Sequence, residues 1–182
     1  MRTLVFDVDD VLWGLNDFVF EHLGINPVII TDFCLDACSE LSDELRKKMI
    51  KMYQSVDVFH SLTPYAGVER IPSLERLGYN LKINSNCLSL EVLNYKFKVL
   101  QSLGFKKENI VLDVGYGTKE IGEDVFGFID DSPYNVAQSK AKINFMPRKV
   151  WNTSEKMKSL VRSKNTVYYS DLNELIDYLE VM

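Results

Sequence analysis

The feature that most constrains the fold is an apolar run near the start of the chain that ends in acidic residues. Residues 4–6 (Leu-Val-Phe) are apolar, and Asp7, Asp9 and Asp10 follow them with Val8 in between. Such a run is typical of a strand that is buried on both faces of a parallel sheet. Carboxylates repel one another and resist burial. The aspartates are therefore either turn and cap residues or part of a site at the end of a core strand.

The rest of the chain alternates between predicted strands and helices. Strands are expected at 80–86, 109–115, 124–131, 143–146 and 166–169, and helices at 67–78, 89–104 and 171–182. Alternation of this kind predicts an α/β fold, Rossmann-like, with a parallel sheet flanked by helices. Ligands of such sheets bind at the carboxyl ends of the strands.

Residues 14–61 interrupt this alternation with helical patterns. Leu45, Met49 and Met52 recur at helical spacing, and Ser42 or Asp43 is placed to cap the helix. We therefore expect a helical insert at 14–61, and a core domain built from 1–13 and 62–182.

Composition limits the function classes. The chain has 182 residues, of which 46% are hydrophobic and 26% charged, with a net charge of −5. This balance argues against a nucleic-acid polymer or an anionic membrane as the main partner, but it allows a small phosphorylated ligand. The start lacks a signal-peptide pattern, and three cysteines form an odd count. We expect buried thiols in a cytoplasmic protein, and the oligomeric state is left open.

A second acidic pair favours the interpretation of these aspartates as a functional site and not as turn residues. Asp130 and Asp131 also follow an apolar run, and in a parallel sheet they would share one edge with Asp7 and Asp9. Two carboxylates about 4 Å apart repel by roughly 4 kcal/mol at an effective dielectric of about 20. Such a cluster needs a cation, and oxygen ligands at an open edge suit Mg²⁺.

Other polar residues near strand ends suit a phosphate group. Ser85 and Asn86 end a predicted strand, where a hydroxyl and backbone N–H groups can hold phosphate oxygens at a helix start. Lys119 lies on a glycine-containing loop before the second acidic strand. By default Ser85 would be an ordinary helix cap and Lys119 a solvent-facing lysine.

These segments together resemble the four motifs of the haloacid dehalogenase superfamily. "FDVDDVLW" resembles motif I, "INSN" motif II, Lys119 motif III and "IDDSPYN" motif IV. The resemblance implies a phosphomonoesterase in which Asp7 is the nucleophile and Asp9 the general acid and base. It also implies that Ser85, Asn86 and Lys119 hold the phosphoryl group. Asp7, the backbone carbonyl of Asp9, and Asp131 would bind Mg²⁺, with Asp130 close by.

Within that superfamily the chain is most similar to the 5′(3′)-deoxyribonucleotidases, because the motif III lysine lies shortly before "IDD". This implies a nucleoside monophosphate as substrate, with the insert as a cap over the site. Five aromatic residues in or next to the cap would either stack on the base or only pack the cap. They are Trp13, Phe18, Phe20, Phe33 and Tyr53. Asp10 stands where the superfamily usually has Gly. The alternatives are a phosphatase of another metabolite or of a phosphoprotein, a phosphoryl transferase, and a non-catalytic binding module.

Overall fold

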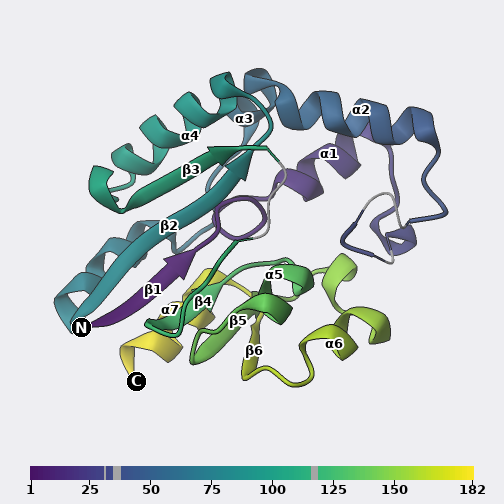
Figure 1. The fold of residues 1–182 in the computed structure, drawn as a ribbon. Helices are drawn as coiled ribbons and strands as arrows, with labels where there is room; N and C mark the ends of the chain where they lie inside the picture. The colour runs from purple at the N-terminus through teal and green to yellow at the C-terminus, as the bar shows by residue number, and fades with distance from the viewer. Residues whose placement is uncertain (31, 35–37, 116–118) are drawn as a thin grey trace.

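The protein is represented by a computed structural model that describes residues 1–30, 32–34, 38–115 and 119–182. One six-stranded sheet has the order β3-β2-β1-β4-β5-β6, and all of its neighbouring strands run parallel (Figure 1). The strands are β1 (Arg2–Phe6), β2 (Tyr79–Cys87), β3 (Ile110–Val114), β4 (Val125–Ile129), β5 (Ile143–Pro147) and β6 (Thr166–Tyr169). The α/β fold with a parallel sheet is confirmed.

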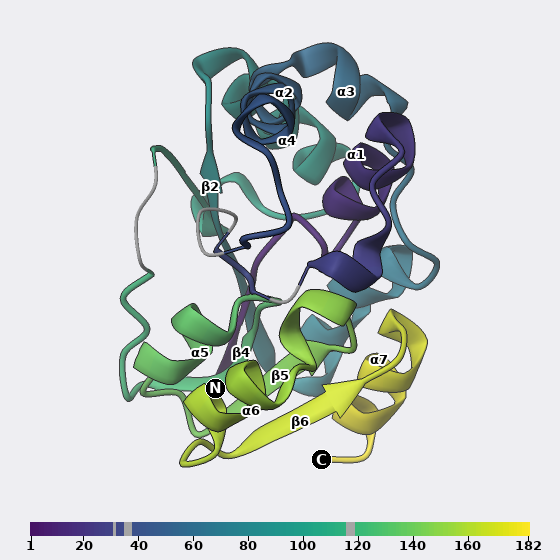
Figure 2. The ribbon, with the colours of Figure 1, turned by 90° about the vertical axis from the view of Figure 1, so that its right-hand side faces the viewer.

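Helices join and cover the strands. The α-helices are α1 (Leu15–Leu23), α2 (Asp43–Gln54), α3 (Val56–Ser61), α4 (Leu90–Ser102), α5 (Pro133–Gln138), α6 (Glu155–Val161) and α7 (Leu172–Glu180). Short 3₁₀ turns are η1 (Pro27–Ile29), η4 (Lys107–Asn109) and η5 (Val150–Asn152), and a longer 3₁₀ helix is η3 (Val68–Leu77). Helices α5 and α6 lie on one side of the sheet and α7 on the other (Figure 2).

The helix expected at 67–78 is present, but its hydrogen bonding is of the 3₁₀ kind. Pro72 lies inside it and has no N–H to donate, which disfavours a regular α-helix. The predicted end at Gly78 is confirmed, since this residue has φ 88° and closes the helix in the left-handed conformation.

The strand order explains where the acidic residues meet. From β1 the chain builds the sheet outward through β2 and β3, and then it returns to the other side of β1 to form β4. The gap between the ends of β1 and β4 is therefore the switch point at which parallel sheets bind ligands. Phe6 pairs with Ile129, so the next residues, Asp7 and Asp130, stand level with each other.

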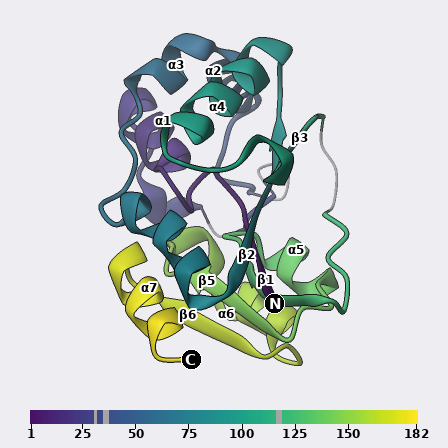
Figure 3. The same cartoon turned by 90° about the vertical axis from the view of Figure 1, so that its left-hand side faces the viewer.

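Helices α1, α2 and α3 of the insert lie beyond the carboxyl ends of β1 and β2 (Figures 1 and 3), and α3 contacts α4, which runs alongside β3. Strands are absent from the described part of 14–61, as expected. Buried insert residues such as Val19, Phe20 and Phe59 belong to the same hydrophobic cluster as Leu4 and Phe6 of β1. The insert is thus packed onto the sheet domain through a shared core. In the described residues, no helix combines the length and the apolar character that a membrane span needs.

Candidate active site

The site begins where β1 and β4 end. Asp7 follows β1, and its backbone N–H donates to the carbonyl of Ile129 at 2.8 Å, which continues the sheet by one more hydrogen bond. Asp130 and Asp131 follow β4. One carboxylate oxygen from each of Asp7, Asp130 and Asp131 lies within 4.8 Å of the others, and all three residues are buried. Of the four carboxylates expected at this edge, those of Asp7, Asp130 and Asp131 meet, whereas that of Asp9 lies outside the group.

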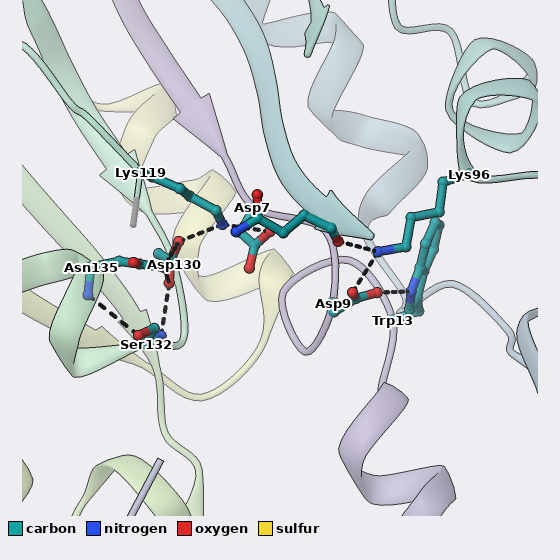
Figure 4. A network of polar contacts seen from close by, with 9 residues as sticks. Asp7, Asp9, Trp13, Lys96, Lys119, Asp130, Ser132 and Asn135 are labelled. Carbon is teal, nitrogen blue, oxygen red and sulfur yellow. Dashed lines mark hydrogen bonds and ion pairs between the residues drawn. The ribbon is translucent and has the colours of Figure 1, made fainter. Parts of the chain in front are cut away.

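Lys119 lies between two of these carboxylates (Figure 4). Its Nζ is 2.7 Å from Oδ1 of Asp7 and 2.8 Å from Oδ2 of Asp130. Burial opposes the charge of this lysine, but Asp130 and Asp7 outweigh it and raise the pKa of Lys119 above its usual range. Lys119 is therefore a buried ammonium group and not the solvent-facing lysine of the default interpretation. Its neighbours 116–118 lie outside the described residues.

The two aspartates of motif IV have different surroundings. Asp130 accepts hydrogen bonds from Lys119, from the backbone N–H of Ser132 at 2.8 Å and from Asn135 Nδ2 at 3.2 Å (Figure 4). Asp131 Oδ2 accepts one from Trp151 Nε1 at 2.9 Å. Thus both carboxylate oxygens of Asp130 are held by fixed donors, and Asp131 is held through one oxygen.

Two residues of η5 support Asp131. Trp151 is buried and aims its indole N–H at the carboxylate, and Asn152 Nδ2 donates to the Asp131 backbone carbonyl at 3.0 Å. The sequence patterns did not predict this contact. A buried Trp needs a partner for its N–H, but a partner 20 residues away leaves no local signal.

Asp9 lies on the loop after β1, closer to α4. Trp13 Nε1 donates to Oδ1 of Asp9 at 2.9 Å, and Lys96 Nζ lies 2.5 Å from Oδ2 (Figure 4). Burial raises the pKa of Asp9, although Lys96 opposes the increase. A raised pKa suits a carboxyl group that has to donate a proton.

Ser85 and Asn86 lie inside β2 and not at a helix start, which corrects one expectation. The strand continues to Cys87, and the cap of α4 is Ser89, whose hydroxyl accepts from the N–H of Val92 at 3.2 Å. β1 and β2 pair Phe6 with Ile83, so Ser85 lies just beyond the level of Asp7 at the same edge of the sheet. Ser85 is buried and Asn86 is partly exposed.

The cluster contains more acidic than basic groups. Burial raises the pKa of Asp130 to about 6, even though Lys119 opposes it, and burial with the neighbouring Asp10 and Asp130 raises that of Asp131 well above its usual value. All the ligand atoms of the cluster are carboxylate oxygens. These observations fit a hard divalent cation such as Mg²⁺, which would supply the missing positive charge.

No family model matches the chain, and the search of curated proteins gave no match either. Solved structures do match. The chain has the haloacid dehalogenase fold. Over its whole length it matches all of a protein from Thermotoga maritima that is assigned as a beta-phosphoglucomutase, with a TM-score of 0.61 and 14% identity.

A haloacid dehalogenase-like family hydrolase from Streptococcus pneumoniae matches with a TM-score of 0.58 and 12% identity, over 98% of each chain. A family IA hydrolase of the same class from Entamoeba histolytica matches 99% of this chain with all of its own length, at a TM-score of 0.50 and 13% identity. These likenesses support the haloacid dehalogenase fold and give no support to the nucleotidase branch in particular.

Proposed function

We propose that the protein is a Mg²⁺-dependent phosphomonoesterase that works through an aspartyl-phosphate on Asp7. The observation that carries the proposal is the position of Lys119. One buried ammonium bridges Asp7 and Asp130 within a cluster of three buried carboxylates at the switch point of the sheet. Such an arrangement is costly for stability and is typical of a site that binds a cation and a phosphate.

In the proposed reaction, a carboxylate oxygen of Asp7 attacks phosphorus and the bond from phosphorus to the leaving oxygen breaks. Asp9 gives its proton to that oxygen. Asp9 then takes a proton from water, the resulting hydroxide attacks phosphorus, and the bond to Asp7 breaks, which releases phosphate and restores both aspartates. Lys119 contacts Asp7 and stabilises the phosphoryl oxygens as charge builds on them.

Asp7, Asp131 and the backbone carbonyl of Asp9 would hold Mg²⁺. When bound, the ion would neutralise the carboxylates and polarise the phosphoryl group. We assign Asp131 over Asp130 because the oxygens of Asp130 are already taken by Lys119, Ser132 and Asn135. Ser85 and Asn86 would bind the phosphoryl oxygens from the end of β2.

The test measures phosphate release from p-nitrophenyl phosphate with and without Mg²⁺. We expect turnover with Mg²⁺ and its loss in excess chelator, with recovery when Mg²⁺ is restored. Asp7→Asn should remove turnover almost completely. An Asp7→Asn variant with wild-type activity would rule out the aspartyl-phosphate route, and full turnover in chelator would rule out the metal.

We further propose a nucleoside monophosphate as substrate, which the short spacing from Lys119 to Asp130 motivates. Of the aromatic side chains suggested for base stacking, Trp13 and Phe20 are buried in the core, which leaves Phe18, Phe33 and Tyr53 partly exposed. A panel of phosphorylated metabolites at equal concentration tests this. Deoxynucleoside monophosphates should give the highest kcat/KM, and a sugar phosphate or phosphoserine ranking first would contradict it.

The alternative is a binding module without catalysis. Such a protein would bind phosphorylated ligands but would release no phosphate from any member of the panel, with or without Mg²⁺. The enzyme is favoured because Lys119 bridges Asp7 and Asp130 and because Asp9, two residues after Asp7, has a raised pKa that suits an acid.

A further inference from the structure

Lys96 is a charged residue buried inside the protein. It lies in the middle of α4, and its side chain is only 1% exposed. Its Nζ contacts Oδ2 of Asp9 at 2.5 Å and donates to the backbone carbonyl of Asn86 at 3.2 Å. The ring of Phe59, from α3 of the insert, lies with its centroid 5.1 Å from the same nitrogen. The ammonium is thus enclosed by Asp9, β2 and the insert.

The second oxygen of the same carboxylate is also held. Trp13, which is buried, donates its indole N–H to Oδ1 of Asp9 at 2.9 Å. We call Lys96 and Trp13 together the Asp9 clamp. Its two donors come from separate elements, α4 and the loop before α1. Each donates a hydrogen bond to a different oxygen of the Asp9 carboxylate (Figure 4).

Stability alone is a poor reason for this arrangement. Lys96 is buried and the side chain of Asp9 is only 22% exposed. Burial of an ion costs several kcal/mol in desolvation, and replacing a buried ion pair by apolar side chains is often neutral or stabilising. Lys96 also lies on the apolar stripe of α4, in line with Val92 and Leu100, where Leu or Met would pack well. The ion pair between Lys96 and Asp9 therefore indicates a functional role for Asp9.

We propose that Lys96, together with Trp13, is a positioning residue that fixes the Asp9 carboxyl group for proton transfer to the leaving oxygen and from the attacking water. The inference rests on the proposed function, in which Asp9 is the acid and base. Proton transfer needs the carboxyl within hydrogen-bond reach of the leaving oxygen, and sites of this kind tolerate errors of only about 0.5 Å. Lys96 also holds the carbonyl of Asn86, so one ammonium ties Asp9 to the strand that would bind the phosphate.

The experiment compares Lys96→Met with the wild type, and each change is also made in an Asp9→Asn background. Lys98→Met is the matched control, because Lys98 is an exposed residue of the same helix. The substrates are p-nitrophenyl phosphate, whose leaving group needs little protonation, and 2-glycerophosphate, whose alkoxide needs a proton. Thermal unfolding of each variant checks that it is folded.

We expect Lys96→Met to lower kcat for 2-glycerophosphate by about 10–100-fold, as losing a partner that orients an active-site group typically does. The loss should be smaller for p-nitrophenyl phosphate, and KM should change little. In the Asp9→Asn background the same substitution should have no further effect, because residues that act as one unit are not additive. Lys98→Met should match the wild type.

Three results would overturn the assignment. They are wild-type turnover by Lys96→Met, an equal and additive loss in the Asp9→Asn background, and a raised KM with unchanged kcat, which would place Lys96 on the substrate. If Lys96→Met does not fold, Trp13→Phe removes the other donor and should give the same leaving-group dependence and the same non-additivity. A wild-type protein that releases no phosphate would overturn the proposed function and this inference with it, whereas an active wild type with additive variants would overturn this inference alone.

Discussion

At the scale of single residues, Asp10 shows how the loop after β1 accommodates a residue other than glycine at a positive φ. Asp10 has φ 59°, the left-handed conformation that glycine adopts most easily. Asp is one of the few other residues that tolerate this conformation. Its Oδ1 also accepts the backbone N–H of Asn16 at 3.0 Å, which fixes the loop that leads into α1.

The two motif IV aspartates give the first prediction. Asp131→Asn should raise the Mg²⁺ concentration for half-maximal activation by about 10-fold or more, because a direct ligand is lost. Asp130→Asn should raise it less, since Asp130 is bound to Lys119 and Asn135. Phosphate release measured over a Mg²⁺ titration checks the order. The opposite order would show that Asp130 is the ligand.

Lys119 gives a second prediction at this scale. Lys119→Ala should lower kcat by about 10²–10³-fold, the usual cost of losing a preorganised donor. Lys140 and Lys107 are exposed and serve as controls, so their change to Ala should leave kcat close to that of the wild type. Steady-state kinetics of the three variants decides the matter, and a silent Lys119→Ala would remove this lysine from the site.

The cysteines differ from the expectation of buried thiols. Cys38 and Cys87 are buried, but Cys34 is exposed. Burial raises the pKa of Cys87 to about 11, so this residue remains a thiol at neutral pH. We therefore predict one fast-reacting thiol in a titration of the native protein with Ellman's reagent, and three after denaturation. Cys34→Ser should abolish the fast reaction, and a fast phase that survives this change would contradict the burial.

At the scale of elements, the sequence was informative where patterns are local. Apolar runs in the sequence predicted β1 and β4. In the structure these two strands are neighbours in the sheet, so their carboxyl ends lie side by side. The partners of the aspartates were not predictable in this way. Lys96 is 87 residues from Asp9, and Trp151 is 20 residues from Asp131, so only the folded packing brings them together. One signal was available for Lys96, namely a lysine on an otherwise apolar helix stripe.

The start of α4 was placed correctly but its relation to Ser85 was not. The strand was expected to end at residue 86, whereas in the structure buried positions alternate with more exposed ones through to Cys87, so β2 includes that residue. The helix therefore begins after Ser89 and not at Ser85. Polar residues such as Ser and Asn occur both at the ends of short strands and at the starts of helices. Here the pairing with β3 places Ser85 and Asn86 in the strand.

Ser89 gives the prediction for this scale. Its hydroxyl accepts from the N–H of Val92, and it also donates to the backbone carbonyl of Gln54 at the end of α2, at 3.0 Å. Ser89→Ala should lower the free energy of unfolding by about 1–2 kcal/mol, from a lost cap and a lost hydrogen bond to the insert. Ser42→Ala, which removes only the cap of α2, should cost about 1 kcal/mol or less. Urea unfolding measures both, and a smaller loss for Ser89→Ala than for Ser42→Ala would contradict the link.

At the scale of the whole molecule, the insert and the sheet domain share one hydrophobic cluster, which includes Phe6 of β1 and Phe59 of α3. Phe59 of α3 covers Lys96, and Ser89 of α4 binds the end of α2. Unfolding of the insert would therefore expose Lys96 and its contact with Asp9. The division into a core and a cap at 14–61 remains a prediction, but on these contacts we expect both parts to unfold in one transition.

The acidic cluster makes stability depend on pH and on the metal together. The pKa of Asp130 is raised to about 6, and those of Asp131 and Asp10 are raised well above their usual values, so the folded protein binds protons that the unfolded chain releases near pH 4. Stability then falls as pH rises from about 4 through 6, because the unfolded state binds fewer protons over that range. Without divalent cations, the melting temperature should therefore decrease between pH 5 and pH 7.

Mg²⁺ should reverse this trend, since it binds the ionised carboxylates of the folded state and so stabilises that state by mass action. The increase in melting temperature on adding Mg²⁺ should be larger at pH 7 than at pH 5. Glu123→Gln, which removes an exposed carboxyl group, is the matched control and should keep both trends. Asp131→Asn should reduce the decrease with pH and the response to Mg²⁺ together, because both depend on the same buried charge. A Mg²⁺ response that is equal at the two pH values would show that the ion does not bind to these carboxylates.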